Sequence, residues 1–204
     1  DSLRSVYYKE YANEWWAYLE GIDITPFESL SDGANRMKQL SDIINSPLKK
    51  LFGDVVRNTR FAGQAFKGFK DKFEKKVEKV MGNVITMHPV DRDFKDLHAF
   101  VGGDPDKKSD LDGAITQLGS VSDELEALST KPPKDAKESA QQFNSGALSL
   151  SMKGVRGALK SRDDRTRRAI SGLFEQPIRY SSRAILSRTM EYLNEQWSRE
   201  VIDP

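Results

Sequence analysis

The residue types best suited to acid–base or metal chemistry near neutral pH are scarce in this sequence. Its 204 residues contain two histidines, His88 and His98, and no cysteine. Histidine titrates near neutral pH and ligates metals, whereas cysteine supplies thiolates for catalysis, disulfides and zinc sites. The two histidines are ten residues apart, outside the i, i+4 spacing of a helical metal site. We expect His88 in a loop before Pro89 and His98 partly buried in a helix, with no joint catalytic or metal role.

A glycine-containing loop before a predicted helix superficially matches a phosphate-binding loop. It runs from Gly102 to Ser109 and ends in Lys108-Ser109. The phosphate-binding motif needs glycine directly before its lysine so that backbone amides reach the phosphates, and Lys107 occupies that position here. No predicted strand precedes the loop, and no serine lies in a G-x-S-x-G context. The sequence therefore predicts no catalytic, cofactor-binding or metal residues, no cofactor and no enzymatic activity.

Arginines cluster in the C-terminal part of the chain and define an alternative function, the binding of nucleic acid or anionic headgroups by a cytoplasmic helical domain. The cluster consists of Arg162, Arg165, Arg167, Arg168, Arg179, Arg183 and Arg188. Such residues can neutralise phosphates, but Asp163 and Asp164 interrupt the cluster, and Phe174 and Tyr180 are too sparse for a base-stacking platform. We favour a solvated face that pairs with acidic helices, either of a neighbouring subunit or of residues 91–138, which hold 12 acidic and 7 basic side chains.

The three tryptophans lie near the two ends of the chain, as Trp15, Trp16 and Trp197. We expect them to pack the first and last helices against each other in the core. Two adjacent residues of a helix point in different directions, so one of Trp15 and Trp16 should be only partly buried. That tryptophan is a candidate for an interface.

Composition and periodicity predict an all-α domain. Hydrophobic residues make up 37% of the chain, charged residues 31%, and the formal net charge is +1. No stretch approaches the roughly eighteen apolar residues of a membrane helix, and the N-terminus lacks the apolar region of a signal peptide, so we expect any membrane span to lie in another part of the parent protein.

Apolar residues recur at helical spacing in nine segments, from which we expect about seven or eight helices. The segments are residues 5–20, from 25 to about 44, from 46, 62–80 with a lysine-rich face, from Asp91 through Phe100, from 109 or 110 to 128, from 136 to about 160, from Ser161, and from about Pro177. The last helix carries one apolar side of Leu186, Met190, Leu193, Trp197 and Val201. The 81–90 loop predicts an N-terminal subdomain of residues 1–85 and a C-terminal one of residues 86–204, or a single domain if they pack together.

Several short landmarks occur in an order that resembles the periplasmic region of the IcmF/TssM family. In the first half they are Val6-Tyr7-Tyr8-Lys9-Glu10-Tyr11, Trp15-Trp16, Leu40-Ser41 and Ser46-Pro47-Leu48. In the second half they are Val90-Asp91-Arg92-Asp93-Phe94, Phe174-Glu175-Gln176-Pro177 and Leu193-Asn194-Glu195-Gln196-Trp197. Each is weak alone, but together they span nearly the whole chain in family order.

The resemblance implies a scaffolding segment of an inner-membrane protein in the type VI secretion system of a Gram-negative bacterium. The segment would be an elongated helical domain that lies in the periplasm and acts through protein–protein contacts. The implied partners are an inner-membrane subunit, further copies in a homo-oligomer, and an outer-membrane lipoprotein, which the family contacts mainly through a C-terminal portion absent here. No nucleic acid and no small-molecule substrate is implied.

Overall fold

A computed structural model describes residues 2–61, 87–102, 108–141 and 146–202. These residues form helices and no strands, so the predicted all-α fold is confirmed. The helices are α1 (Ser2–Glu20), α2 (Leu30–Ser41), α3 (Pro47–Thr59), α5 (Pro89–Asp93), α6 (Lys95–Val101), α7 (Asp110–Thr130), α8 (Pro133–Gln141), α9 (Ala147–Leu159) and α10 (Asp164–Trp197), with a π-helical turn η1 (Ser198–Ile202). The lysine-rich helix predicted over residues 62–80 lies outside the described residues.

Serine side chains begin three helices, two of them where the sequence predicts. Ser46 Oγ accepts a hydrogen bond from Leu48 N at the start of α3, and Ser109 Oγ accepts one from Asp112 N at the start of α7. The start predicted at Thr25 is wrong, because α2 begins at Leu30 with Ser29 as its cap. The residues before α2 are not helical and are bound to α10 instead. Gln176 of α10 accepts a hydrogen bond from Ile24 N and donates one to Asp23.

Two further boundaries differ from the prediction. The single helix expected from residue 136 to about 160 is two helices, α8 and α9. Helix α8 begins at Pro133, where the missing N–H of proline costs nothing because first-turn amides have no helical partner. Asp91 does not cap a helix. It lies inside α5, where it is buried and accepts a hydrogen bond from Phe61 N, while His88 caps that helix.

Helix α10 joins into one helix the two that are predicted from Ser161 and from about Pro177. Asp163, rather than Ser161, caps it, and Pro177 lies inside its 34 residues instead of at the start of a separate helix. Proline removes one N–H from the helical hydrogen bonds, a cost of about 3 kcal/mol in an unsupported helix. The helix continues because Phe174, Pro177 and Ile178 are all buried against the core.

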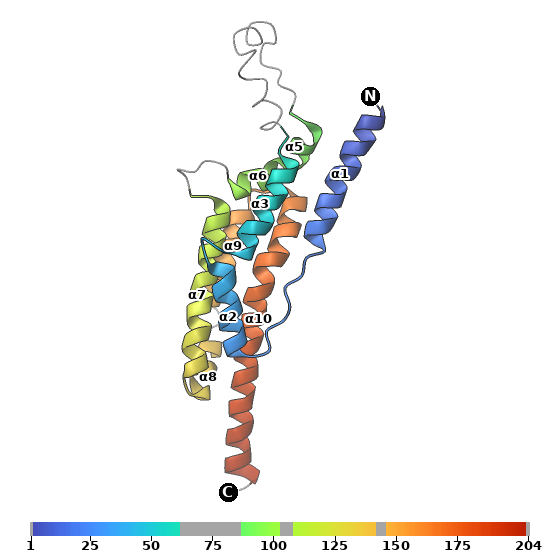
Figure 1. Ribbon diagram of the computed structural model, residues 1–204. Coiled ribbons are helices and arrows are strands. Elements are labelled where there is room, and N and C mark those ends of the chain that lie inside the picture. Colours follow the sequence, from blue (N-terminus) through green and yellow to red (C-terminus); the bar gives the residue numbers. More distant parts are fainter. Residues whose placement is uncertain (1, 62–86, 103–107, 142–145, 203–204) are drawn as a thin grey trace.

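The helices form an elongated bundle around α10. Helix α2 packs along α7, α9 lies against α7 and α10, and α8 lies against α10. Helix α1 contacts α5 and α10. Figure 1 shows the last turns of α10 extending beyond the other helices at one end, while the start of α1 lies at the opposite end. No helix in the described part of the chain combines the length and apolar character needed to cross a bilayer.

Aromatic side chains form the centre of the core. Trp16 of α1 stacks on Phe94, with ring centroids 4.4 Å apart and planes 5° apart. Phe52, Phe100 and Phe174 meet with centroid separations of 6.0 to 6.3 Å. These rings come from distant segments, so α1, α3, α6 and α10 share one apolar core.

Candidate interaction surfaces

Both histidines pack against neighbouring side chains of the fold. His88 stacks on Phe61 with a centroid separation of 4.4 Å, and its ring edge meets Tyr8. His98 is buried, with Nε2 2.8 Å from Thr59 Oγ1. Burial is the main cause that lowers the pKa of His98 from 6.5 to about 4. Within the described ranges, no three His, Cys, Asp or Glu side chains are placed to hold a metal ion.

The loop compared with a phosphate-binding loop separates into two helix ends. Gly102 ends α6 with a φ of 82°, a conformation that favours glycine, and Ser109 caps α7. Lys108 is exposed. The intervening residues 103–107 lie outside the described residues.

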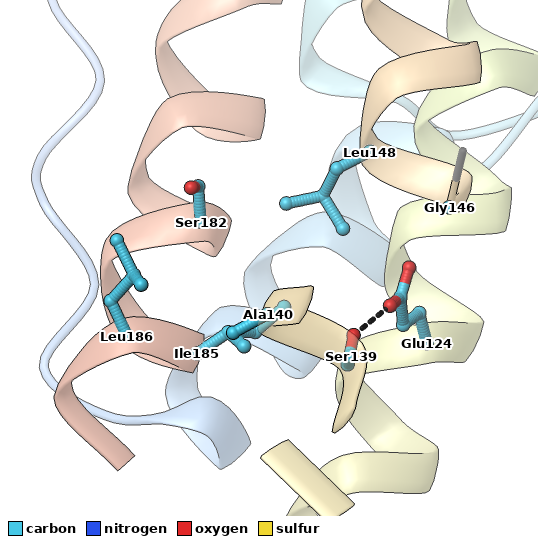
Figure 2. Close-up of a pocket in the computed structure, with 8 residues that line it drawn as sticks. All are labelled: Glu124, Ser139, Ala140, Gly146, Leu148, Ser182, Ile185 and Leu186. Carbon is cyan, nitrogen blue, oxygen red and sulfur yellow. Dashed lines mark hydrogen bonds between the residues drawn. The ribbon is translucent and has the colours of Figure 1, made fainter. Parts of the chain in front are cut away.

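A small pocket lies where α7, α8, α9 and α10 meet (Figure 2). Glu124 and Ser139 line it together with apolar side chains that include Leu148 and Ile185. Ser139 Oγ donates a hydrogen bond to one Glu124 oxygen, while the other oxygen is buried with no hydrogen-bond partner among the described residues. Its volume is about 10 Å³, which is room for no more than one water molecule. The pocket is therefore a packing defect in a mostly apolar lining, with no room for a substrate.

Most of the clustered arginines are engaged within the chain. Those with ion pairs to acidic side chains are Arg162 with Asp110, Arg165 with Glu20, Arg167 with Asp164, Arg179 with Glu175, and Arg188 with Glu191. Arg183 lies over the ring of Tyr180, at 5.7 Å from its centroid. The Arg162–Asp110 pair joins the turn before α10 to the acidic segment, as the charge distribution predicts. Along a straight helix the cluster extends for about 40 Å, so the arginines do not form one compact anion site.

An exposed apolar face occupies the free end of α10 and the π-helical turn η1 that follows it. We call it the α10 stripe, and it consists of Leu186 (49% exposed), Met190 (56%), Leu193 (40%), Trp197 (61%) and Val201 (53%). The prediction that Trp197 packs in the core against α1 is wrong, because α10 extends beyond the other helices and Trp197 lies on that extension. Contiguous exposed apolar side chains of this kind mark contact surfaces.

A second surface is a groove between α1 and α3, which we call the α1–α3 groove. It measures about 600 Å³ and is lined by Tyr11, Glu14, Trp15, Tyr18, Leu51, Asp54 and Asn58. Tyr11 OH donates a hydrogen bond of 2.8 Å to the backbone oxygen of Asn58, which ties the two helices together at one end. Trp15 is half-buried in the groove while Trp16 is buried in the core, so the prediction of two different environments is confirmed.

Comparison with known proteins finds one similarity in sequence and one in fold. Residues 1–60 match the family model described as "IcmF-related: Intracellular multiplication and human macrophage-killing". The fold matches a chain of the solved "Type VI secretion system membrane core complex" with a TM-score of 0.69 and 18% identity, over 99% of this chain and 38% of that one. The present chain thus spans 38% of the length of that relative. No curated protein sequence matches. The sequence match over the first 60 residues and the fold match over nearly all of the chain confirm the predicted resemblance to the IcmF/TssM family.

Proposed function

We propose that this chain is a helical periplasmic segment of a type VI secretion membrane-complex subunit, and that it acts as a scaffold through protein–protein contacts. The observation that carries the proposal is the fold match over 99% of the chain to a protein of the membrane core complex. The proposed partners are further copies of the subunit, an inner-membrane subunit and an outer-membrane lipoprotein, the last mainly through regions outside this chain.

Two features of the surface support a scaffolding role. The α10 stripe exposes apolar side chains that a partner would bury. The arginines that would support anion binding are largely paired within the chain, which weakens the alternative of a cytoplasmic domain for nucleic acid or headgroups. The proposal is therefore a protein that holds other proteins and catalyses no reaction.

Cysteine labelling in intact cells tests the periplasmic location. Lys108→Cys places a thiol at an exposed position, and the chain contains no other cysteine. In a full-length protein stripped of cysteines elsewhere, a membrane-impermeant maleimide should label this position without lysis. Ser122→Cys is the matched buried control, because Ser122 is 3% exposed and should react only after denaturation. Labelling of Lys108→Cys only after the inner membrane is opened would contradict the proposal.

A further inference from the structure

We propose that the α1–α3 groove binds a basic amphipathic helical segment of another polypeptide, with an arginine or lysine side chain between the aromatic rings of α1 and the carboxylates of Glu14 and Asp54. The inference rests on the proposed function only in taking the ligand to be a polypeptide. The shape, the chemistry and the position of the groove support it independently.

The shape of the groove fits a helix. Tyr11, Glu14, Trp15 and Tyr18 follow i, i+3, i+4, i+7 spacing, so they share one face of α1. Leu51, Asp54 and Asn58 follow i, i+3, i+7 spacing on α3. Two helices that present such faces to a common groove leave room for the side-chain ridge of a third helix. The lining residues span about 10 Å of α1, which corresponds to about two turns of a bound helix.

The chemistry of the groove fits a cation flanked by apolar side chains. Trp15 and Tyr18 meet edge to face with centroids 5.8 Å apart, and Tyr18 is 54% exposed. Aromatic faces attract guanidinium and ammonium groups. Glu14 is exposed and has no ion-pair partner within the described residues, whereas Asp54 pairs with Arg57 at 3.1 Å. The groove thus offers aromatic faces together with one carboxylate that no described residue pairs with.

The other side of α1 already shows the same kind of contact. The guanidinium carbon of Arg165 lies 5.2 Å from the ring centroid of Trp16, and the Arg165 side chain also reaches Asn13 and Glu20. An arginine from a partner over Trp15, next to Glu14, would repeat this arrangement on the opposite face. The contact of Arg165 with Trp16 is therefore an example, within this chain, of the contact proposed between the ligand and Trp15.

The position of the groove links it to the family match. All seven lining residues fall within residues 1–60, the segment that matches the IcmF-related family model. The α10 stripe lies outside that segment, on α10. A partner in the α1–α3 groove would therefore bind a different surface from a partner that covers the α10 stripe.

Titration with matched peptides tests the proposal. The probe is a synthetic amphipathic peptide of about three helical turns with two arginines, and its control carries citrulline, a neutral isostere, in their place. The indole N–H signals of Trp15, Trp16 and Trp197 report binding by NMR. We expect the Trp15 signal to shift while those of Trp16 and Trp197 stay, and we expect citrulline to weaken binding about tenfold.

Charge variants locate the interaction. Glu14→Gln should weaken binding of the arginine peptide about three- to fivefold, because it removes one exposed carboxylate from the groove. Glu126→Gln is the matched control, since Glu126 is also exposed on a helix but lies on α7, and it should bind like the parent chain. Circular dichroism confirms that both variants remain folded.

Three outcomes would overturn the proposal. The first is a Trp15 signal that does not shift, and the second is equal affinity for the arginine and citrulline peptides. The third is that the parent chain sediments as a dimer and the Glu14→Gln variant as a monomer, because the occupant of the groove would then be a second copy of this chain. Because this titration does not involve cellular location, its failure leaves the Lys108→Cys result standing, and the converse also holds.

Discussion

Single residues from separate landmarks of the sequence meet in the folded chain. Trp16 of the first helix stacks on Phe94, which ends the Val90–Phe94 landmark. Gln176, in the Phe174–Pro177 landmark, hydrogen-bonds to Ile24 N and to Asp23. Glu175 of the same landmark accepts hydrogen bonds from Arg156 and Arg179, which hold the pKa of its carboxyl below its usual value. Residues of these landmarks therefore make contacts that hold the fold together.

His98 should make stability depend on pH. Its pKa is about 4 in the folded chain and 6.5 in the unfolded chain, chiefly because burial disfavours the charged ring, with Arg60 adding to the effect and Asp91 opposing it. The unfolded chain then binds the extra proton, so stability is fully present above pH 6.5 and falls as pH drops toward 4. We expect a loss of about 2 kcal/mol over this window, discounted for solvent screening.

Urea unfolding between pH 7.5 and pH 4 measures this dependence. His98→Gln is the control, because glutamine does not titrate and its curve should be flatter by about the histidine contribution. An identical pH dependence in both proteins would assign the effect to other groups.

At the scale of elements, α9 and α10 show how neighbours override local sequence signals. Pro177 and Gly172 both weaken a helix, yet α10 passes through both because its apolar face is buried on the core. Close packing against α7 favours glycine at position 154 of α9, since a Cβ there would lie 2.7 Å from Cδ of Gln117. At Gly172 a Cβ would meet no described atom within 4 Å.

The two glycines should therefore respond differently to alanine. Gly172→Ala should raise the free energy of unfolding by about 0.5–1 kcal/mol, because alanine loses less backbone entropy in a helix. Gly154→Ala should show none of this gain, or a loss of about 1 kcal/mol, because Gln117 must move. Thermal unfolding of both variants measures the difference, and equal stabilisation would show that α9 has room to shift away from α7.

At the scale of the whole molecule, the bundle leaves the end of α10 without a partner among the described residues. The α10 stripe has the regular spacing of a core face, and its side chains are 40 to 61% exposed. Its apolar area contributes little to the stability of the isolated chain, because it stays in contact with water. We therefore expect the α10 stripe to affect assembly more than folding.

Two tryptophan variants test whether folding depends on the core and not on the α10 stripe. Trp16→Ala should lower the free energy of unfolding by about 3–5 kcal/mol, because Trp16 is 1% exposed and stacks on Phe94. Trp197→Ala should change it by no more than about 0.5 kcal/mol. Urea unfolding followed by far-ultraviolet circular dichroism measures both without relying on tryptophan emission. A large loss in Trp197→Ala would mean that the end of α10 is packed in solution.

The features that the sequence alone determined are local ones. Periodicity identified an all-α chain, and the caps Ser46 and Ser109 were predictable because a capping bond reaches only two or three residues along the chain. The landmarks identified the family resemblance. The contrast between Trp15 and Trp16 also followed from the geometry of one helix. The division into residues 1–85 and 86–204 remains a prediction.

Tertiary structure decided what depends on neighbours distant in sequence. Gln176 binds residues 23 and 24, so α2 starts later than its local signal at Thr25 suggests. Burial carries α10 through Pro177. The apolar period of residues 186–201 is the same whether a partner covers it or not, so only the arrangement of the helices shows that this face is exposed. The α1–α3 groove likewise exists only because two helices stand apart, and spacing within either helix does not encode that separation.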